Sequence, residues 1–361
     1  MASPRLLAAP SLPLLGELAR GADRVRHGLW RWAAHTSLGR RCARDRATRV
    51  AVLAAVQILV SLALTLVAPL WLLLVGPLVL GVPHAVSDVR FLLLRPSRPL
   101  GRAQAIAVLV PLAAMTALRL ARFAGAPVYL EVEGLLGAAA IAGAVALART
   151  SALARAGGMG AALVLAAVAV GEPQVLAVVL GHVHNFVAVG LWLAWLPRGS
   201  ARAALPVVAL LVAGMAALAL GAGDAHLAAA PAAGLSLDDL VVTLAPGLPP
   251  TLALRLVLTY AFAQSVHYAL WVRVIPETLA PGAPAPTWRR SLGALQADLG
   301  RHGLVAALVV AAVVAAAGLV APADTRNAYL SLVLFHGWLE LAMAARLLVD
   351  RAPRRATAVS P

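Results

Sequence analysis

Long, uninterrupted apolar segments run through most of the chain, and they limit its possible folds more than any other feature. A continuous apolar segment of about twenty residues is typical of a transmembrane helix, whereas a membrane β-barrel needs shorter segments that alternate apolar and polar residues. Only 12% of the 361 residues are charged, compared with about 25% in soluble domains. We therefore predict an all-α, polytopic transmembrane helical bundle of about ten spans, at residues 51–67, 70–94, 104–121, 133–148, 158–171, 173–197, 203–222, 252–275, 303–321 and 328–348.

The positions of the arginines indicate how these spans are oriented. The chain contains no Lys, so all 30 of its basic residues are Arg. Cytoplasmic segments of membrane proteins accumulate Arg and Lys, and we therefore predict that both termini are cytoplasmic and that the membrane is the inner membrane of a bacterium. The same distribution accounts for the net charge of +15 without a nucleic-acid partner. With this orientation all but four of the arginines lie inside, and the four outside are Arg119, Arg122, Arg255 and Arg326.

The chain is expected to have three regions. Residues 1–50 contain ten Arg among Leu-rich pieces, which is typical of a cytoplasmic or interfacial segment whose amphipathic parts lie on anionic membrane lipid. Residues 51–349 form the transmembrane helical domain, and residues 350–361 form a cytoplasmic tail.

Five of the nine histidines lie inside the predicted spans, where polar side chains are costly and are functional candidates by default. The spans that carry them all run from outside to inside. With a rise of about 1.5 Å per residue, one His in each of these four spans falls within roughly 5 Å of the membrane midplane. This common depth predicts a shared metal or cofactor site, with candidate ligands His84, His182, His184, His267 and His336.

Polar residues that accompany these histidines are candidates for orienting them. Asp88 follows His84 by four residues and Glu340 follows His336 by four, so each carboxylate shares a helix face with its histidine. A ligating His usually donates its second N–H to such a group. Gln264 shares a face with the histidine of its own span, three residues later.

His182 and His184 cannot both face one site on a regular helix, because they lie about 200° apart around its axis. Either of them can be the ligand. Asn185 extends the polar face beside His184 and slightly favours that residue.

Imidazole ligands suit iron, copper or zinc and argue against calcium or magnesium. Ferrous iron (non-haem Fe²⁺) with an open coordination position binds O₂, and haem is the alternative, since histidines on facing helices can supply both of its axial ligands.

The stretch Gly81-Val-Pro-His84-Ala-Val-Ser-Asp88 resembles the Gly-x-Pro-His-Gly-x-x-Asp motif of the Brp/Blh family of membrane β-carotene 15,15'-dioxygenases. The resemblance implies a multi-helix membrane protein that holds a non-haem iron through four His, with His84 as one ligand, and cleaves the central double bond of β-carotene to give retinal. The resemblance covers about eight residues. Ala85 replaces the second Gly of the motif, and the family's later pair of His spaced four apart has no counterpart here.

Together these features predict a membrane-embedded oxidoreductase that acts with O₂ on a carotenoid or another lipid-soluble small molecule. This chemistry requires no catalytic nucleophile or general base from the protein, and no motif for one is evident in the sequence. A haem-binding electron-transfer protein is one alternative. A proton-coupled transporter is another, in which the midplane His, Asp and Glu form a relay and Pro83 and Pro173 break helices around a binding site.

Overall fold

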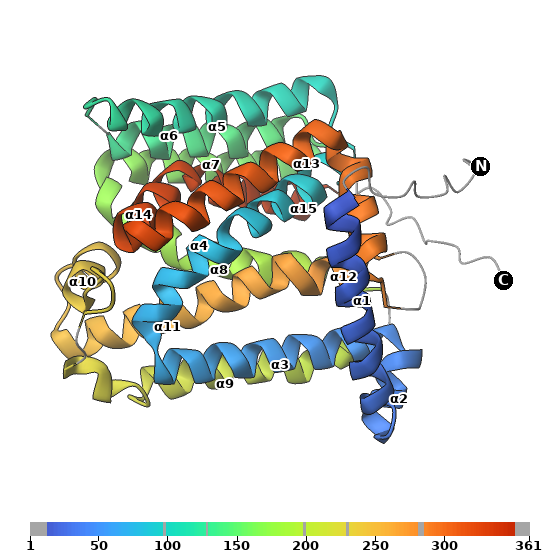
Figure 1. Ribbon diagram of the computed structural model, residues 1–361. Coiled ribbons are helices and arrows are strands. Elements are labelled where there is room, and N and C mark those ends of the chain that lie inside the picture. Colours follow the sequence, from blue (N-terminus) through green and yellow to red (C-terminus); the bar gives the residue numbers. More distant parts are fainter. Residues whose placement is uncertain are drawn as a thin grey trace. The chain divides into compact units, whose positions relative to one another are not determined.

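The computed structural model describes residues 13–96, 99–127, 129–197, 200–228, 231–280 and 285–350. Within these ranges every regular element is a helix, and the one β-type contact is an isolated bridge between Ala232 and Leu235 (Figure 1). The all-α prediction is confirmed. The predicted tail, apart from Asp350, and the first twelve residues of the predicted N-terminal segment lie outside the described residues.

The chain divides into two compact units. Unit 1 comprises Met1–Arg95 and Ala188–Tyr329, and unit 2 comprises Pro96–Val187 and Leu330–Pro361. Two helices, α8 (Pro173–Trp195) and α14 (Pro322–Leu332), pass from one unit into the other.

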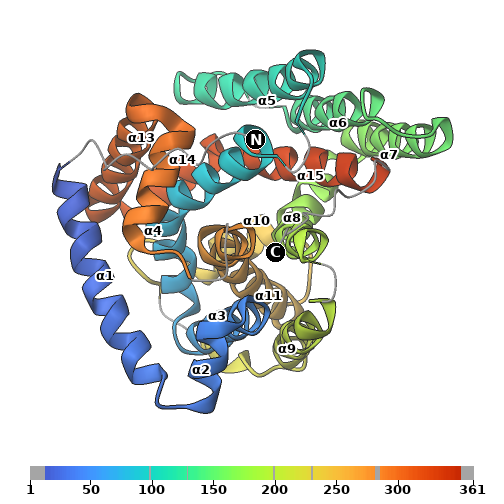
Figure 2. The same cartoon turned by 90° about the vertical axis from the view of Figure 1, so that its right-hand side faces the viewer.

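Unit 1 contains the N-terminal helices and most of the second half of the chain. Helix α11 packs against α3 and α4, α9 packs against α3 and α11, and α13 packs against α4. In Figures 1 and 2, α3 and α9 run side by side. The elements of unit 1, besides parts of α8 and α14, are α1 (Pro13–Ala33), α2 (Ser37–Arg44), α3 (Arg46–Val67), α4 (Pro69–Asp88), η1 (Val89–Leu94), α9 (Ala201–Ala219), η2 (Asp224–Ala228), α10 (Leu237–Leu244), α11 (Pro250–Ala269), η3 (Leu270–Val274), α12 (Ile275–Leu279) and α13 (Trp288–Val320).

Unit 2 is a group of helices joined by close glycine contacts. Its helices, besides parts of α8 and α14, are α5 (Arg102–Phe123), α6 (Leu130–Ala146), α7 (Ala152–Gly171) and α15 (Leu334–Val349). Helix α6 packs against α5, α7 and α15. Gly143 of α6 lies against the carbonyl of Ala107 in α5, and a Cβ at this glycine would lie 2.7 Å from that oxygen. Ala107 precedes Pro111 by four residues, so its carbonyl lacks the usual helical N–H donor.

Eight helical segments of the described chain are long and apolar enough to cross a membrane, which supports an integral, multi-pass membrane protein. Two of the ten predicted spans are not among them. The span predicted at 133–148 lies on α6, which has only 17 residues and carries Glu131 and Glu133 in its first turn. The span predicted at 252–275 lies on α11 and η3, where Arg255, Gln264 and His267 lower the hydropathy.

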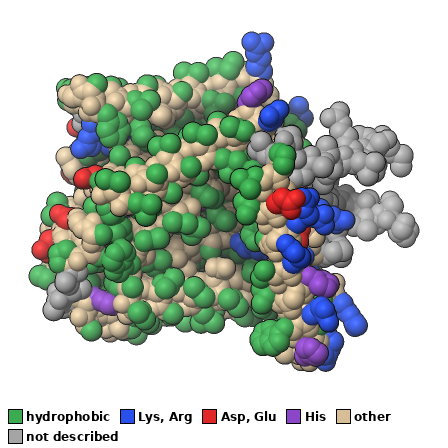
Figure 3. All heavy atoms as spheres, viewed as in Figure 1, with side chains coloured by type: hydrophobic (Ala, Val, Ile, Leu, Met, Phe, Trp, Pro, Cys, Tyr) green, Lys and Arg blue, Asp and Glu red, His purple; other side chains and the backbone are tan. Residues whose placement is uncertain are grey.

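Within unit 1, helix α1 lies to one side of α3 and α11 and next to α13, as Figure 2 shows. Its N-terminal half packs alongside α13, and Asp23 accepts a 2.7 Å hydrogen bond from the backbone N–H of Trp288. Blue basic side chains gather around α1 and α2 in Figure 3. Five large apolar residues of α1 are nevertheless exposed: Leu14, Leu18, Val25, Leu29 and Trp32.

Candidate metal-binding histidine pairs

Unit 1 brings two of the predicted ligands together on neighbouring helices. His84 of α4 and His267 of α11 are both fully buried. Their ring centroids are 5.4 Å apart with an interplanar angle of 71°, and a nitrogen of one ring lies within 4.8 Å of a nitrogen of the other. Two imidazoles that bind one ion in adjacent positions, with metal–nitrogen bonds of about 2.1 Å, have centroids about 5 Å apart. This pair therefore has the separation of two ligands to one metal.

A π-helical segment follows each of these two histidines. Segment η1 begins five residues after His84, and segment η3 begins three residues after His267. Such segments are rare in proteins and occur frequently at functional sites. Neither segment was predicted from the sequence, although both helices share the spacing His-x4-Val-Arg, which ends at Arg90 and at Arg273. That repeated spacing is the signal from which the similarity of the two helices could have been found.

The basic residues that follow His84 are bound to an acidic residue of another helix. Arg90 Nε lies 2.6 Å from Asp298 of α13, and Arg95 also forms an ion pair with Asp298. These are the arginines nearest in sequence to Asp88, which is fully buried. Asp88 lies one turn after His84 on α4, as the spacing predicts.

An aromatic side chain, Tyr268, lies near both histidines of the pair in unit 1. The ring of Tyr268 lies 4.4 Å from that of His84 and 6.0 Å from that of His267. Gln264, a predicted neighbour of His267, donates a 3.0 Å hydrogen bond to the hydroxyl of Tyr260. A direct role for Gln264 at a metal site stays a prediction.

Unit 2 brings together another pair. The rings of His184 in α8 and His336 in α15 are 5.5 Å apart, with an interplanar angle of 79°. Nδ1 of His184 lies 3.1 Å from the carbonyl oxygen of Leu180, and Nδ1 of His336 lies beside the carbonyl oxygen of Val333. A carbonyl only accepts hydrogen bonds, so both Nδ1 atoms carry the proton. Nε2 is then the nitrogen with the lone pair that a metal requires.

The carboxylate of Glu340 belongs to the same part of unit 2. It is fully buried, and one of its oxygens lies within 4.8 Å of a nitrogen of His336. Asn185, next to His184, donates its side-chain N–H to the carbonyl of Gly181 at 3.0 Å. Glu340 is thus placed to ligate an ion or to orient His336, whereas Asn185 holds its own helix.

The geometry of unit 2 favours His184 over His182 as the ligand of α8. The ring that lies beside His336 is that of His184, and His182 points to a different side of the helix, about 200° away. The donors are two imidazoles in unit 1 and two imidazoles with the carboxylate of Glu340 in unit 2, and such donors fit iron, copper or zinc.

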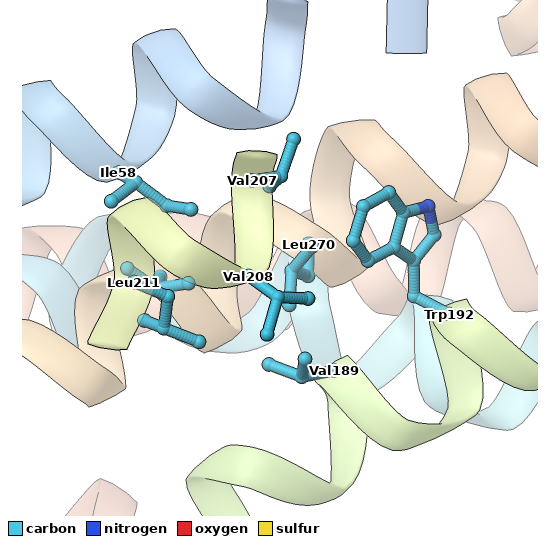
Figure 4. Close-up of a pocket in the computed structure, with 8 residues that line it drawn as sticks. Ile58, Val189, Trp192, Val207, Val208, Leu211 and Leu270 are labelled. Carbon is cyan, nitrogen blue, oxygen red and sulfur yellow. The ribbon is translucent and has the colours of Figure 1, made fainter. Parts of the chain in front are cut away.

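A small cavity of unit 1 does not belong to either pair. It has a volume of about 10 Å³, which is room for one water molecule at most. Figure 4 shows apolar side chains pointing into it, and the lining residues are Ile58, Val189, Trp192, Val207, Val208, Leu211, Val266 and Leu270. Such a cavity is too small for a lipid-soluble substrate.

Comparisons of the chain with protein-family models, with curated proteins and with solved structures found no match.

Proposed function

We propose that this protein is a membrane-embedded oxidoreductase that holds a non-haem iron through intramembrane histidines and acts with O₂ on a carotenoid or another lipid-soluble molecule. The observation that carries the proposal is the pairing of His84 with His267 and of His184 with His336, each at the centroid separation of two adjacent ligands. The resemblance of the segment around His84 to the Brp/Blh motif gives the substrate class.

The two separations also favour a non-haem metal over haem. Two axial ligands of a haem lie on opposite sides of the iron, which places their ring centroids more than about 6 Å apart. The pairs in this protein are at 5.4 and 5.5 Å, with rings nearly perpendicular to each other. This arrangement suits neighbouring positions on one ion.

A bound ferrous iron with an open coordination position would bind O₂. The residues of the chain hold and orient the ion. The hydrogen bonds from Nδ1 of His184 and His336 fix the tautomers, and Glu340 adds negative charge beside His336. The surrounding apolar helices exclude water, and a carotenoid dissolved in the bilayer approaches the histidines from the lipid.

The proposal includes a topology of ten spans with both termini in the cytoplasm of a bacterial cell. Adding α6 and α11 to the eight segments that are long and apolar enough gives ten. The exposed apolar residues of α1 support the prediction of an interfacial N-terminal segment on anionic lipid, because a helix with an apolar face and a basic face lies in the plane of the membrane surface.

The test is to purify the protein in detergent and to measure its metal content and visible spectrum together. We expect iron without a Soret band, and cleavage of an added carotenoid in the presence of O₂. A Soret band would instead indicate a haem protein. The absence of both metal and chromophore would contradict the proposal and leave a transporter as the better explanation.

Four single variants, His84→Ala, His267→Ala, His184→Ala and His336→Ala, then identify the ligands. If all four histidines bind one ion, each variant loses most of the iron. If each pair binds its own ion, each variant loses about half of it. His302→Ala, at an exposed histidine of α13, is the control and should retain all of the iron.

A further inference from the structure

Tyr329 of α14 is a buried residue of unit 1 whose hydroxyl is left without a hydrogen-bond partner among the described residues. The side chain is only 5% exposed. Buried polar groups in proteins are nearly always paired, and each exception calls for an explanation. Tyr329 was not among the site residues predicted from the sequence.

The ring of Tyr329 lies directly on the face of α4 that carries His84. A Cβ added at Gly81 would lie 2.6 Å from the Tyr329 hydroxyl oxygen, so only glycine leaves room for this ring. Gly81 precedes His84 by three residues and Asp88 by seven, and these spacings place all three on one side of the helix. The hydroxyl therefore lies against the side of α4 that carries His84.

A second tyrosine of unit 1 lies against the same helix. A Cβ added at Gly76 of α4 would lie 3.6 Å from the ring of Tyr268, and that ring lies 4.4 Å from the ring of His84. The unpaired hydroxyl is thus on the side of α4 where a small molecule bound next to His84 and His267 would lie.

We propose that the Tyr329 hydroxyl donates a hydrogen bond to a small oxygen-donor or anionic ligand that binds beside His84 and His267. Tyr329 is in this view a positioning residue, and it orients that ligand through its hydroxyl. The inference rests on the proposed function, because it assumes a metal at this pair. It also explains the glycine at position 81, which admits the tyrosine ring.

The test compares Tyr329→Phe with two matched variants. Tyr260→Phe removes a buried hydroxyl that is already paired with Gln264, and Tyr129→Phe changes an exposed tyrosine. In the metal-free protein we expect the thermal unfolding midpoint of Tyr329→Phe to be equal to that of the unmodified protein or higher, since no hydrogen bond is lost. Tyr260→Phe should lower the midpoint, because the Gln264 amide loses its acceptor.

The second measurement is the affinity of the iron-loaded protein for azide, an anionic probe of the open position. Tyr329→Phe should keep its iron but bind azide about tenfold more weakly, which is the effect of losing one hydrogen bond to a charged group. Tyr129→Phe should bind azide as the unmodified protein does.

Different results would overturn different parts of the argument. If the unmodified protein bound no metal, the proposed function and the role of Tyr329 would both be wrong. If the protein bound iron and Tyr329→Phe kept full azide affinity, only the role of Tyr329 would be wrong. A fall in the midpoint as large as that of Tyr260→Phe would show that the hydroxyl has a structural partner.

Discussion

The hydroxyl of Ser87 donates a 2.7 Å hydrogen bond to the backbone carbonyl of Trp271. This carbonyl lies in the π-helical segment η3, where the N–H of Ile275 bonds to the carbonyl of Leu270, five residues earlier. The corresponding donor for Trp271 would be residue 276, which is Pro and has no N–H. Ser87 therefore supplies the missing hydrogen bond and fixes α4, three residues after His84, to the end of the helix that carries His267.

Replacing this serine should destabilise unit 1. Ser87→Ala leaves the Trp271 carbonyl buried without its donor, and we expect a loss of about 1 kcal/mol in the free energy of unfolding. Thermal or denaturant unfolding in detergent measures the loss. The control is the same substitution in a Pro276→Ala background, where residue 276 regains an N–H that can reach Trp271. An equal loss in both backgrounds would contradict this account of the bond.

Two glycines of unit 2, Gly137 in α6 and Gly160 in α7, differ in the space around them and can be compared by the same substitution. A Cβ at Gly137 would overlap the indole ring of Trp338 in α15, whereas a Cβ at Gly160 would meet nothing within 4 Å. Gly137→Ala should therefore destabilise the protein by about 1–3 kcal/mol through overpacking. Gly160→Ala should be neutral or stabilise it by up to about 1 kcal/mol, because alanine loses less conformational entropy in a helix.

Trp338, which a Cβ at Gly137 would overlap, follows His336 by two residues. The two glycine variants should therefore also differ in their effect on metal binding. Gly137→Ala displaces Trp338 and with it the start of α15, which should lower the iron content, while Gly160→Ala should leave it unchanged. Metal analysis of both purified variants measures this. Full iron content in a destabilised Gly137→Ala protein would show that His336 does not depend on the position of Trp338.

His182 and His184 offer a sharper comparison, because they lie two residues apart on α8 and project from different sides of the helix. His184→Ala removes the ring that lies 5.5 Å from that of His336 and should remove at least half of the bound iron. His182→Ala should retain it. The reverse result would mean that α8 turns its other face toward His336 when the metal is bound.

Much of the helical arrangement could be predicted because its boundaries depend on local chemistry. Helix α3 ends at Val67, α4 begins at Pro69 and α8 begins at Pro173, within one residue of the predicted limits of these spans, whereas α14 begins at Pro322, six residues before the predicted start of the last span. At the first position of a helix, proline lacks an N–H that would have no partner anyway. The candidate ligands were found for a similarly local reason, since an imidazole inside an apolar segment stands out in the sequence.

The features that escaped prediction depend on contacts between distant parts of the chain. The π-helical segments are one example, and the unpaired hydroxyl of Tyr329 is another. A third is Arg326, which the distribution of charge placed outside the membrane. It is buried in unit 1, where its Nε donates a 2.8 Å hydrogen bond to the carbonyl of Leu73. Pro77 deprives that carbonyl of its helical donor, and no local pattern shows that an arginine some 250 residues later supplies it.

Helix α1 supports a prediction about the membrane surface itself. At 100° per residue, its five exposed apolar residues fall within an arc of about 60°, and the exposed Arg20, Arg24 and Arg31 lie on another side, centred roughly 130° away. A helix with this division lies at the interface with its apolar side in the acyl chains and its basic side among anionic headgroups.

Spin labels test this arrangement directly, because Cys42 is the only cysteine of the chain. In a Cys42→Ser background, a label at Val25→Cys should be accessible to O₂ dissolved in the bilayer, and a label at Arg24→Cys should be accessible to a water-soluble nickel complex. The two positions are adjacent in sequence, so the comparison depends on helix orientation alone. In vesicles that contain anionic lipid the difference should be larger than in neutral vesicles, because the arginines hold the helix at the surface. Equal accessibility of both labels to the nickel complex would show that α1 does not rest on the membrane.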